Sequence, residues 1–250
     1  MFAERNLTEE QMLRIKNSPE YKACIGYDQN NPHHFLPLDL HMQRVADEVE
    51  NQAPWDGWLY TAAMLHDIGK AAPGIMRVDK KRNNRYFGHA AESAKIARRL
   101  LLAVGYPEAA TWIVCWYIQH HDDFISFKIS EDEVPQNHPF YRLVTVQNVA
   151  EVILKTFLDV DSDKDIDANS VVRFLMTGKA PSWGRVVPYE FKPEGEIPPL
   201  NAFESLIILI RADASAQVGP EPKIAVADAV EKVIRDAYAM AKCVMDKNNK

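Results

Sequence analysis

Residues 60–70 read YTAAMLHDIGK, an apolar run with helical patterning that ends in an adjacent imidazole and carboxylate. A buried apolar helix gains nothing from two polar side chains at its end unless something binds them. Neutral imidazole and carboxylate both ligate divalent cations of intermediate softness, so a metal ion is the simplest partner for His66 and Asp67. Neighbouring residues on a helix point about 100° apart. We therefore expect other helices to supply further ligands.

Candidate ligands occur in four other segments with helical patterning. In three of these segments a histidine stands at the first or last turn. In the fourth, the apolar run at 206–214, a carboxylate lies inside the segment. Burying that carboxylate unpaired would be costly, and a metal ion would remove the cost. Pairing of Asp213 with Arg211 is the structural alternative, and a hydrogen-bonded core residue is the alternative for His41. The predicted metal ligands are His41, His66, Asp67, His89, His120, His121 and Asp213.

The order of these residues resembles that of the HD superfamily of metal-dependent phosphohydrolases. The signature is HDIGK at 66–70. The segment FGHAAESA at 87–94 resembles the third-ligand segment of HD domains attached to bacterial CCA-adding tRNA nucleotidyltransferases, and RAD at 211–213 resembles their last-ligand helix. The double histidine is similar to that of HD-GYP proteins, but the GYP tripeptide at 105–107 precedes the pair and is interpreted as a helix-breaking turn.

The resemblance implies an all-α fold, an HD-domain helical bundle with an additional helical or irregular insertion before the last ligand helix. A chain of 250 residues suits one large domain or one domain with a substantial insertion. We expect a single HD-type domain over 1–250. Its parts would be an N-terminal helix and loop (1–36), a metal-binding core (37–125 and 201–220), a substrate-side insertion (126–200) and a C-terminal helix and tail (222–250).

Apolar periodicity places the individual helices. A capping box from Thr8 to Gln11 begins the first, and Gly69 is expected to end the HD helix. The segment 71–88 is predicted to be a loop or short hairpin, and 178–200 to be irregular. The acidic stretch 159–167 lacks the Gly and Glu of a calcium loop and is interpreted as a solvated turn. Besides the HD helix, helices are predicted at 9–17, 37–49, 88–104, 108–121, 138–158, 201–217 and 222–245.

The resemblance also implies a centre of divalent metal ions. Family members with paired histidines usually hold two cations, and Pro37 stands where three-metal members carry Glu, so two cations are expected. One would be held by His41, His66, Asp67 and Asp213, and the other by Asp67, His89, His120 and His121. Histidine-rich ligation suits Mn, Fe, Co, Ni or Zn better than Mg.

The implied reaction is hydrolysis of a phosphomonoester or phosphodiester by a metal-activated hydroxide, placing the protein among the ester hydrolases of EC class 3.1. The substrate would be a small phosphorylated molecule, a nucleotide or a nucleic-acid end. Asp67 and Lys70 are the predicted catalytic residues, with Lys70 holding a phosphate as a point charge. A solvated lysine at a helix end is its alternative. The predicted substrate-binding residues are Lys70, Arg77, Arg82 and Arg85. The three arginines lie in a basic segment that could attract a phosphorylated substrate. The alternative is a charged loop that is exposed to solvent and has no role in binding.

Two other functions remain open. Some HD proteins are di-iron oxygenases with the same ligands, and Lys70, a residue suited to phosphate, argues against this. The other is a non-catalytic nucleotide-binding module, which the complete set of seven ligands disfavours. His33 and His34 lie in the loop before His41, where surface or structural roles are the favoured interpretation.

Composition limits the partners and the compartment. A net charge of −6 argues against bulk nucleic-acid binding, which depends on a basic surface. The three cysteines are far apart and are interpreted as reduced thiols. The N-terminus has no signal-peptide pattern, and the apolar run 206–210 is too short to cross a membrane. We expect a cytoplasmic protein without membrane association, and the sequence leaves its oligomeric state open.

Overall fold

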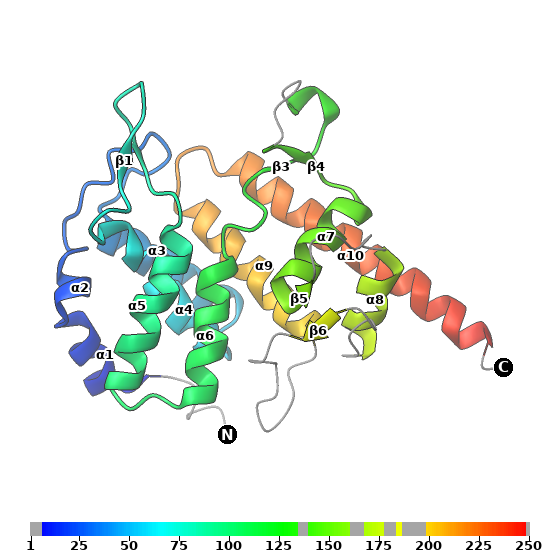
Figure 1. Ribbon diagram of the computed structural model, residues 1–250, viewed down its shortest axis with the longest axis horizontal. Helices are drawn as coiled ribbons and strands as arrows, with labels where there is room; N and C mark the ends of the chain where they lie inside the picture. Colours follow the sequence, from blue (N-terminus) through cyan, green and yellow to red (C-terminus); the bar gives the residue numbers. More distant parts are fainter. Residues whose placement is uncertain (1–6, 135–139, 161–167, 178–183, 187–198, 249–250) are drawn as a thin grey trace. The chain divides into compact units, whose positions relative to one another are not determined.

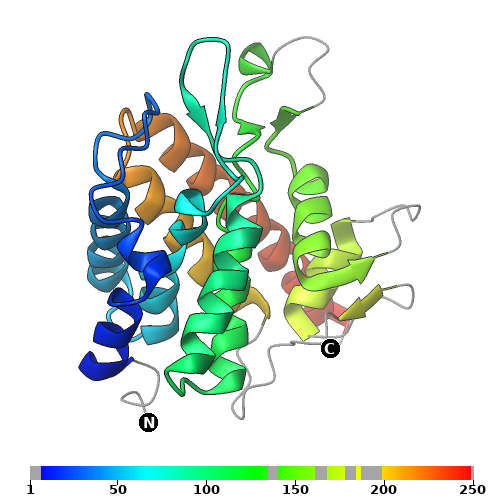
Figure 2. The same ribbon diagram turned by 60° about the vertical axis from the view of Figure 1, so that its left-hand side comes forward.

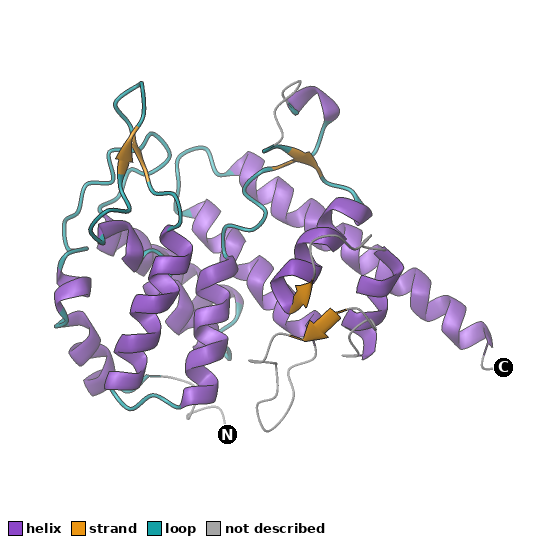
Figure 3. Cartoon of the chain, in the orientation of Figure 1, coloured by secondary structure: helices purple, strands orange, loops and turns teal. Residues whose placement is uncertain are grey.

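The computed structural model is mostly α-helical, and its strands form short two-stranded pairs (Figures 1 and 3). The predicted all-α class is therefore confirmed. The chain divides into two units, unit 1 with residues 1–122 and 208–221, and unit 2 with residues 123–207 and 222–250. One HD-type domain over the whole chain stays a prediction. The structure describes residues 7–134, 140–160, 168–177, 184–186 and 199–248.

Unit 1 contains helices from the N-terminal half of the chain and a small hairpin. The segment Ile68–Ala71 is a short 3-10 helix, η2. The other elements are α1 (Glu9–Lys16), α2 (Pro19–Lys22), α3 (Leu38–Gln52), α4 (Gly57–Leu65), β1 (Arg77–Val78), β2 (Asn84–Arg85), α5 (His89–Ala103) and α6 (Glu108–His120).

Helix α4 is the centre of this unit. Asp56 caps its amino terminus, where the carboxylate accepts a hydrogen bond from the Leu59 N–H at 3.0 Å. All of its residues except Tyr60 are buried, as expected of a helix that is apolar on every side. It packs against α3 and α6. The carboxyl end of α4 therefore delivers the next residues, His66 and Asp67, into the interior.

The HD helix ends earlier than predicted, and the role assigned to Gly69 is wrong. Helix α4 ends at Leu65, and after His66 and Asp67 the chain continues as η2. Gly69 does not have a positive φ. A Cβ atom there would lie 2.5 Å from the Ser93 nitrogen and 2.7 Å from the His89 carbonyl oxygen. Glycine is required because η2 packs directly on the first turn of α5, where the Gly69 N–H also donates to Ser93 Oγ at 2.8 Å.

The remaining helix predictions for unit 1 are confirmed within a few residues. The capping box at the start of α1 is present, with Thr8 Oγ1 accepting from the Gln11 N–H. One short helix, α2, lies in the region predicted to be a loop. Ser18 caps it and Pro19 occupies its first position, which are ordinary signals for a helix start.

The segment between η2 and α5 forms the predicted short hairpin. Strands β1 and β2 are antiparallel, and Figure 2 shows the hairpin projecting beyond the start of α5. The loop 28–34 fastens it. The Asn84 N–H donates to the Asn30 carbonyl at 2.9 Å, and the Asn31 side chain donates to the Asn84 carbonyl at 3.2 Å. The hairpin and this loop therefore form one structural feature.

Unit 2 contains the elements that follow α6. The predicted helix 138–158 begins later than expected, at Val146, and α8 was not predicted. The acidic stretch 161–167, and most of the segment 178–200, lie outside the described residues. The elements are β3 (Phe127–Lys128), η3 (Glu131–Glu133), β4 (Arg142–Leu143), α7 (Val146–Phe157), β5 (Leu158–Val160), α8 (Ala168–Thr177) and β6 (Gly184–Val186).

The two last helices agree with the prediction. Helix α9 covers Pro199–Ser215, and its residues from 208 onward belong to unit 1. Helix α10 covers Glu221–Asn248. None of the helices in the described part of the chain is long and apolar enough to cross a membrane.

We expect Gly69→Ala to destabilise the protein by about 1–3 kcal/mol, because the added methyl group overpacks the contact between η2 and α5. Chemical denaturation followed by circular dichroism measures this loss. Ser93→Ala in the Gly69→Ala background should not restore stability, since the nearest atoms are backbone atoms of Ser93 and His89. A Gly69→Ala protein as stable as the wild type would contradict this explanation.

Candidate metal centre

Six of the seven predicted ligands lie together in unit 1, at the ends of helices. His41 is near the start of α3, His66 caps the carboxyl end of α4 with Asp67 beside it, and His89 is the first residue of α5. His121 caps the carboxyl end of α6, and Asp213 is in the last turn of α9. All are buried except Asp213, whose side chain is 13% exposed.

One group of donor atoms surrounds Oδ2 of Asp67. It contains His41, His66, Asp67 and Asp213, whose donor atoms all lie within 4.8 Å of one another. Asp67 Oδ2 is 3.4 Å from His41 Nε2 and 3.3 Å from His66 Nε2. Asp213 Oδ1 is 2.9 Å from His41 Nε2 and 3.6 Å from His66 Nε2. The other Asp213 oxygen accepts a hydrogen bond from the Gln217 side chain at 2.9 Å, which orients Oδ1 toward the histidines.

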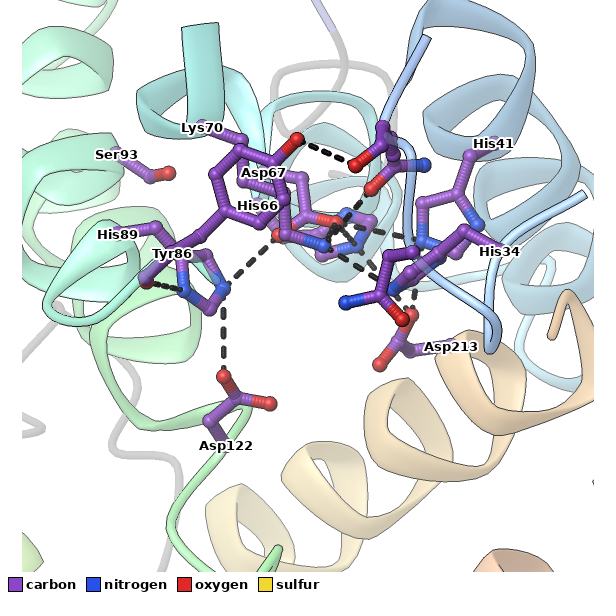
Figure 4. Close-up of polar contacts among 12 residues, drawn as sticks. His34, His41, His66, Asp67, Lys70, Tyr86, His89, Ser93, Asp122 and Asp213 are labelled. Carbon is purple, nitrogen blue, oxygen red and sulfur yellow. Dashed lines mark hydrogen bonds and ion pairs between the residues drawn. The ribbon is translucent and has the colours of Figure 1, made fainter. Parts of the chain in front are cut away.

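A second group surrounds the other oxygen of the same carboxylate. Asp67 Oδ1 is 3.0 Å from His89 Nε2 and 3.7 Å from His121 Nε2, and the two ring nitrogens are 3.3 Å apart. These three residues also fit one metal ion. Figure 4 shows Asp67 in the middle of the site, with His89 on one side and His41 on the other. One carboxylate therefore faces two separate groups of imidazoles, one with each oxygen.

Backbone carbonyls fix the orientation of three imidazoles. Nδ1 of His66, His89 and His121 lies 2.8, 2.8 and 2.6 Å from the carbonyl oxygen three residues earlier in the chain. Because a carbonyl only accepts, each Nδ1 carries the hydrogen, and the lone pair of the neutral ring is on Nε2. For His66 and His121 this carbonyl belongs to the last turn of a helix, where carbonyls have no partner in the helix. The helix ends thus prepare these rings as ligands.

The buried donor atoms of the first group fit a divalent cation. Nε2 of His41 and His66, Oδ1 of Asp67 and Oδ1 of Asp213 have no hydrogen-bond partner, while Oδ2 of Asp67 pairs with the Lys70 ammonium. An unsatisfied buried polar atom costs roughly 1–3 kcal/mol, and more if it is charged. Imidazole nitrogens and carboxylate oxygens in this number are a ligand set for a divalent transition metal. A bound cation would satisfy all of these atoms together.

Charge interactions inside the site are strong. Burial would raise the pKa of Asp67, but the Lys70 ammonium and the His66 ring hold it well below its usual range. Burial would also lower the pKa of His66, but the Asp67 and Asp213 carboxylates raise it to about 10. Without a cation, His66 therefore carries a proton at neutral pH between two ionised carboxylates.

Lys70 lies inside the site, so the alternative of a solvated lysine is wrong. Its side chain is 6% exposed, and Nζ is 2.6 Å from Asp67 Oδ2. Nζ also donates to Gln29 Oε1 at 3.2 Å, lies 3.4 Å from His34 Nε2, and sits over the Tyr86 ring at 5.7 Å (Figure 4). The loop that fastens the hairpin therefore also surrounds the ammonium group.

His120 is the predicted ligand that the structure does not bring to the cluster. Its ring packs against Trp116, one turn earlier on α6, with the centroids 5.3 Å apart. Adjacent helical residues point about 100° apart, and His121 is the one that faces Asp67. Asp122, the next residue, does approach the cluster, with Oδ2 3.3 Å from His89 Nε2.

The predicted substrate-binding arginines lie on the hairpin. Arg77 is exposed and donates to the carbonyls of Gly74 and Met76. Arg82 is exposed and has a positive φ of 65°. Arg85 is half-buried and pairs with Asp79 at 2.9 Å. Two of the three arginine side chains are thus held by hydrogen bonds within the hairpin.

Sequence reasoning missed several residues of the site. No sequence pattern identified Gln29, Tyr86 and Gln217 as site residues. Each is a neutral residue in a loop or just after a helix, where neither periodicity nor a charge pattern marks it. His34 was judged a surface or structural residue, but it is half-buried with its ring edge-on to His41, the centroids 4.8 Å apart. Burial, together with the nearby Lys70 ammonium, lowers the pKa of His34 to about 3, so this ring is neutral.

Comparison with known proteins gives one family. A family model described as "HD domain" matches residues 39–159, which include every predicted ligand except Asp213. No curated protein matches the chain.

Addition of Mn(II) or Zn(II) should raise the melting temperature of the metal-free protein. Binding to the folded state alone contributes about 2.7 kcal/mol at a free cation concentration of about 100 times Kd. Asp213→Asn should lose most of this stabilisation, whereas Asp47→Asn, at an exposed position of α3, should keep it. Differential scanning calorimetry with and without metal measures the effect. Equal stabilisation of both variants would contradict the assigned ligand.

Metal binding should release protons. His66 in the metal-free protein has a pKa of about 10, so its Nε2 is protonated below that pH and must lose the proton to bind a cation. Between pH 7 and 9 we expect release of about one proton per chain and an affinity that rises with pH, becoming level above about pH 10. Titration calorimetry in buffers of different ionisation enthalpy measures the released protons. A binding enthalpy that is the same in all buffers would oppose this prediction.

Proposed function

We propose that the chain, whose residues 39–159 match the HD domain, is a metal-dependent phosphohydrolase with two divalent cations. Its substrate would be a phosphomonoester or phosphodiester, in a nucleotide or at the end of a nucleic acid. The observation that supports this most directly is the position of Asp67. Each of its oxygens faces a different group of ligands, which suits a carboxylate that bridges two cations.

The proposed ligands divide according to the two oxygens of Asp67. His41, His66 and Asp213 would hold the first cation with Oδ2, and His89 and His121 would hold the second with Oδ1. When bound, such a pair supplies Lewis acidity for phosphoryl oxygens and lowers the pKa of water at the site toward neutrality. Nitrogen-rich ligation favours Mn, Fe, Co, Ni or Zn over Mg.

Lys70 supports phosphate rather than another substrate. Its ammonium group now pairs with Asp67 Oδ2, the same oxygen that faces the first group of ligands. A cation on that oxygen would repel the ammonium, so the lysine then needs another anion close by. A substrate phosphoryl group fits this need, and Lys70 would neutralise the charge that develops on it.

Neighbouring residues keep the ammonium at the site when it leaves Asp67. Gln29 is buried, and its Oε1 accepts from Nζ. The Tyr86 hydroxyl donates to the Gln29 carbonyl at 2.7 Å, which holds the ring and the loop together around Lys70. His34, which is neutral, has a further ring nitrogen beside Nζ. These residues would orient Lys70, while Arg77, Arg82 and Arg85 of the hairpin would attract the phosphate from solution.

We expect phosphate release from a panel of nucleotides and phosphodiesters in the presence of Mn(II), Co(II), Ni(II) or Zn(II). Lys70→Met should lower kcat roughly 100- to 1000-fold, as expected for a donor to the developing charge, with bound metal unchanged. Lys95→Met, which removes an exposed lysine on α5, is the matched control. Asp67→Ala should bind no cation pair and release no phosphate.

The same assays separate the competing function. If the wild-type protein consumes oxygen with Fe(II) and releases no phosphate with any cation, the protein is an oxygenase and the proposal is wrong. Full phosphate release by the Lys70→Met protein would refute the assigned role of the lysine.

A further inference from the structure

The second group of ligands has one protein donor fewer than the first. Among the residues that the structure describes, the first group offers two imidazoles and two carboxylates, whereas the second offers Asp67 Oδ1, His89 Nε2 and His121 Nε2. Structural zinc sites use four protein ligands, whereas catalytic sites hold the ion with three and leave one position to water or substrate. His120, the fourth donor expected from the sequence, packs against Trp116 instead.

The Asp122 carboxylate approaches the same two imidazoles. Its Oδ2 is 3.3 Å from His89 Nε2, and its Oδ1 is 3.8 Å from His121 Nε2. Figure 4 shows it on a different side of His89 from Asp67, so Nε2 of His89 lies between two carboxylates. The Asp122 side chain is 30% exposed. It therefore lies at the open edge of the group.

These atoms are all acceptors when the rings are neutral. Nδ1 of His89 and of His121 donates to a backbone carbonyl, so both Nε2 lone pairs point toward the carboxylates and toward each other. Lone pairs and negative oxygens at such distances repel each other unless a positive charge lies between them. Asp122 also follows the carboxyl end of α6, where the helix dipole disfavours a negative charge. A cation among these atoms would attract each lone pair and each carboxylate oxygen and so outweigh their mutual repulsion.

The next carboxylate in the sequence, that of Asp123, has a different hydrogen-bond partner. Asp123 Oδ2 accepts a hydrogen bond from Thr156 Oγ1 at 2.6 Å. The chain thus offers two adjacent carboxylates with the same charge, of which Asp122 is the one that approaches His89 and His121. This difference provides a matched control.

We propose that Asp122, and not His120, is the fourth protein ligand of the second cation. Both sites then have the same donor set: two imidazole nitrogens, one carboxylate of their own and one oxygen of the shared Asp67. Three carboxylates balance most of the charge of two divalent cations, leaving a net positive charge for an anionic substrate. The inference rests on the proposed pair of cations, but its test does not depend on turnover.

The test counts Mn(II) ions in the full-length protein. After loading with excess Mn(II) and desalting, elemental analysis should find two ions per chain in the wild type, and electron paramagnetic resonance should show an exchange-coupled pair. Asp122→Asn should weaken the second site roughly tenfold to 100-fold or more, leaving one ion and the spectrum of isolated Mn(II). Asp123→Asn and His120→Gln should keep two ions and the coupled spectrum. Asp122→Ala, which removes the oxygen entirely, should agree with Asp122→Asn.

Circular dichroism of the metal-free variants verifies that each is folded, so that lost metal reports a lost ligand. The inference is overturned if Asp122→Asn and Asp122→Ala retain two ions at unchanged affinity, if His120→Gln is the variant that loses one, or if the wild type binds a single ion. If the wild type binds two ions, Asp122→Asn binds one, and no phosphate ester is cleaved, the ligand assignment stands and the proposed function fails. If the wild type cleaves a phosphate ester but both Asp122 variants retain two ions, the proposed function stands and the ligand assignment fails.

Discussion

A single buried carboxylate has to be balanced by positive charge, and unit 1 is arranged around this requirement. Asp67 is 1% exposed, and its two oxygens face different pairs of imidazoles. In the metal-free protein the Lys70 ammonium and the His66 proton supply the balance. Both lie on the Oδ2 side of Asp67, so positive charge already faces that oxygen in the protein without metal. This is the physical basis for assigning a metal centre here.

Helix ends, rather than helix faces, supply most residues of the buried cluster. A helix leaves its last carbonyls without partners, and His66 and His121 use such a carbonyl to hold Nδ1 while Nε2 points into the site. A capping interaction that stabilises the helix thus also prepares the ligand. The close contact at Gly69 has a related effect, because it sets η2, which follows Asp67, directly against the first turn of α5, which begins with His89.

The sequence was sufficient to predict the longer helices of unit 1 and most residues of the buried cluster, because these depend on local patterns. The apolar run that begins at Tyr60 indicated a buried helix ending in His66 and Asp67. A carboxylate in the apolar run of α9 indicated a buried partner, and Asp213 lies 3.6 Å from His66, more than 140 residues earlier in the chain. What failed depends on contacts between segments. The close approach at Gly69, the burial of Lys70 under the loop 28–34, and the position of His120 against Trp116 are decided by how helix ends meet, which periodicity does not encode. In unit 2, patterning placed α7 too early and missed α8.

The central claim is that Asp67 bridges two cations held by imidazoles from α3, α4, α5 and α6. Crystals of the protein grown with Mn(II), with diffraction measured on both sides of the manganese absorption edge, test it most directly. The account predicts two anomalous peaks about 3.5–4 Å apart, the usual spacing of binuclear sites, with one Asp67 oxygen bound to each. Anomalous density that lies away from Asp67, or its absence from the cluster altogether, would contradict the account.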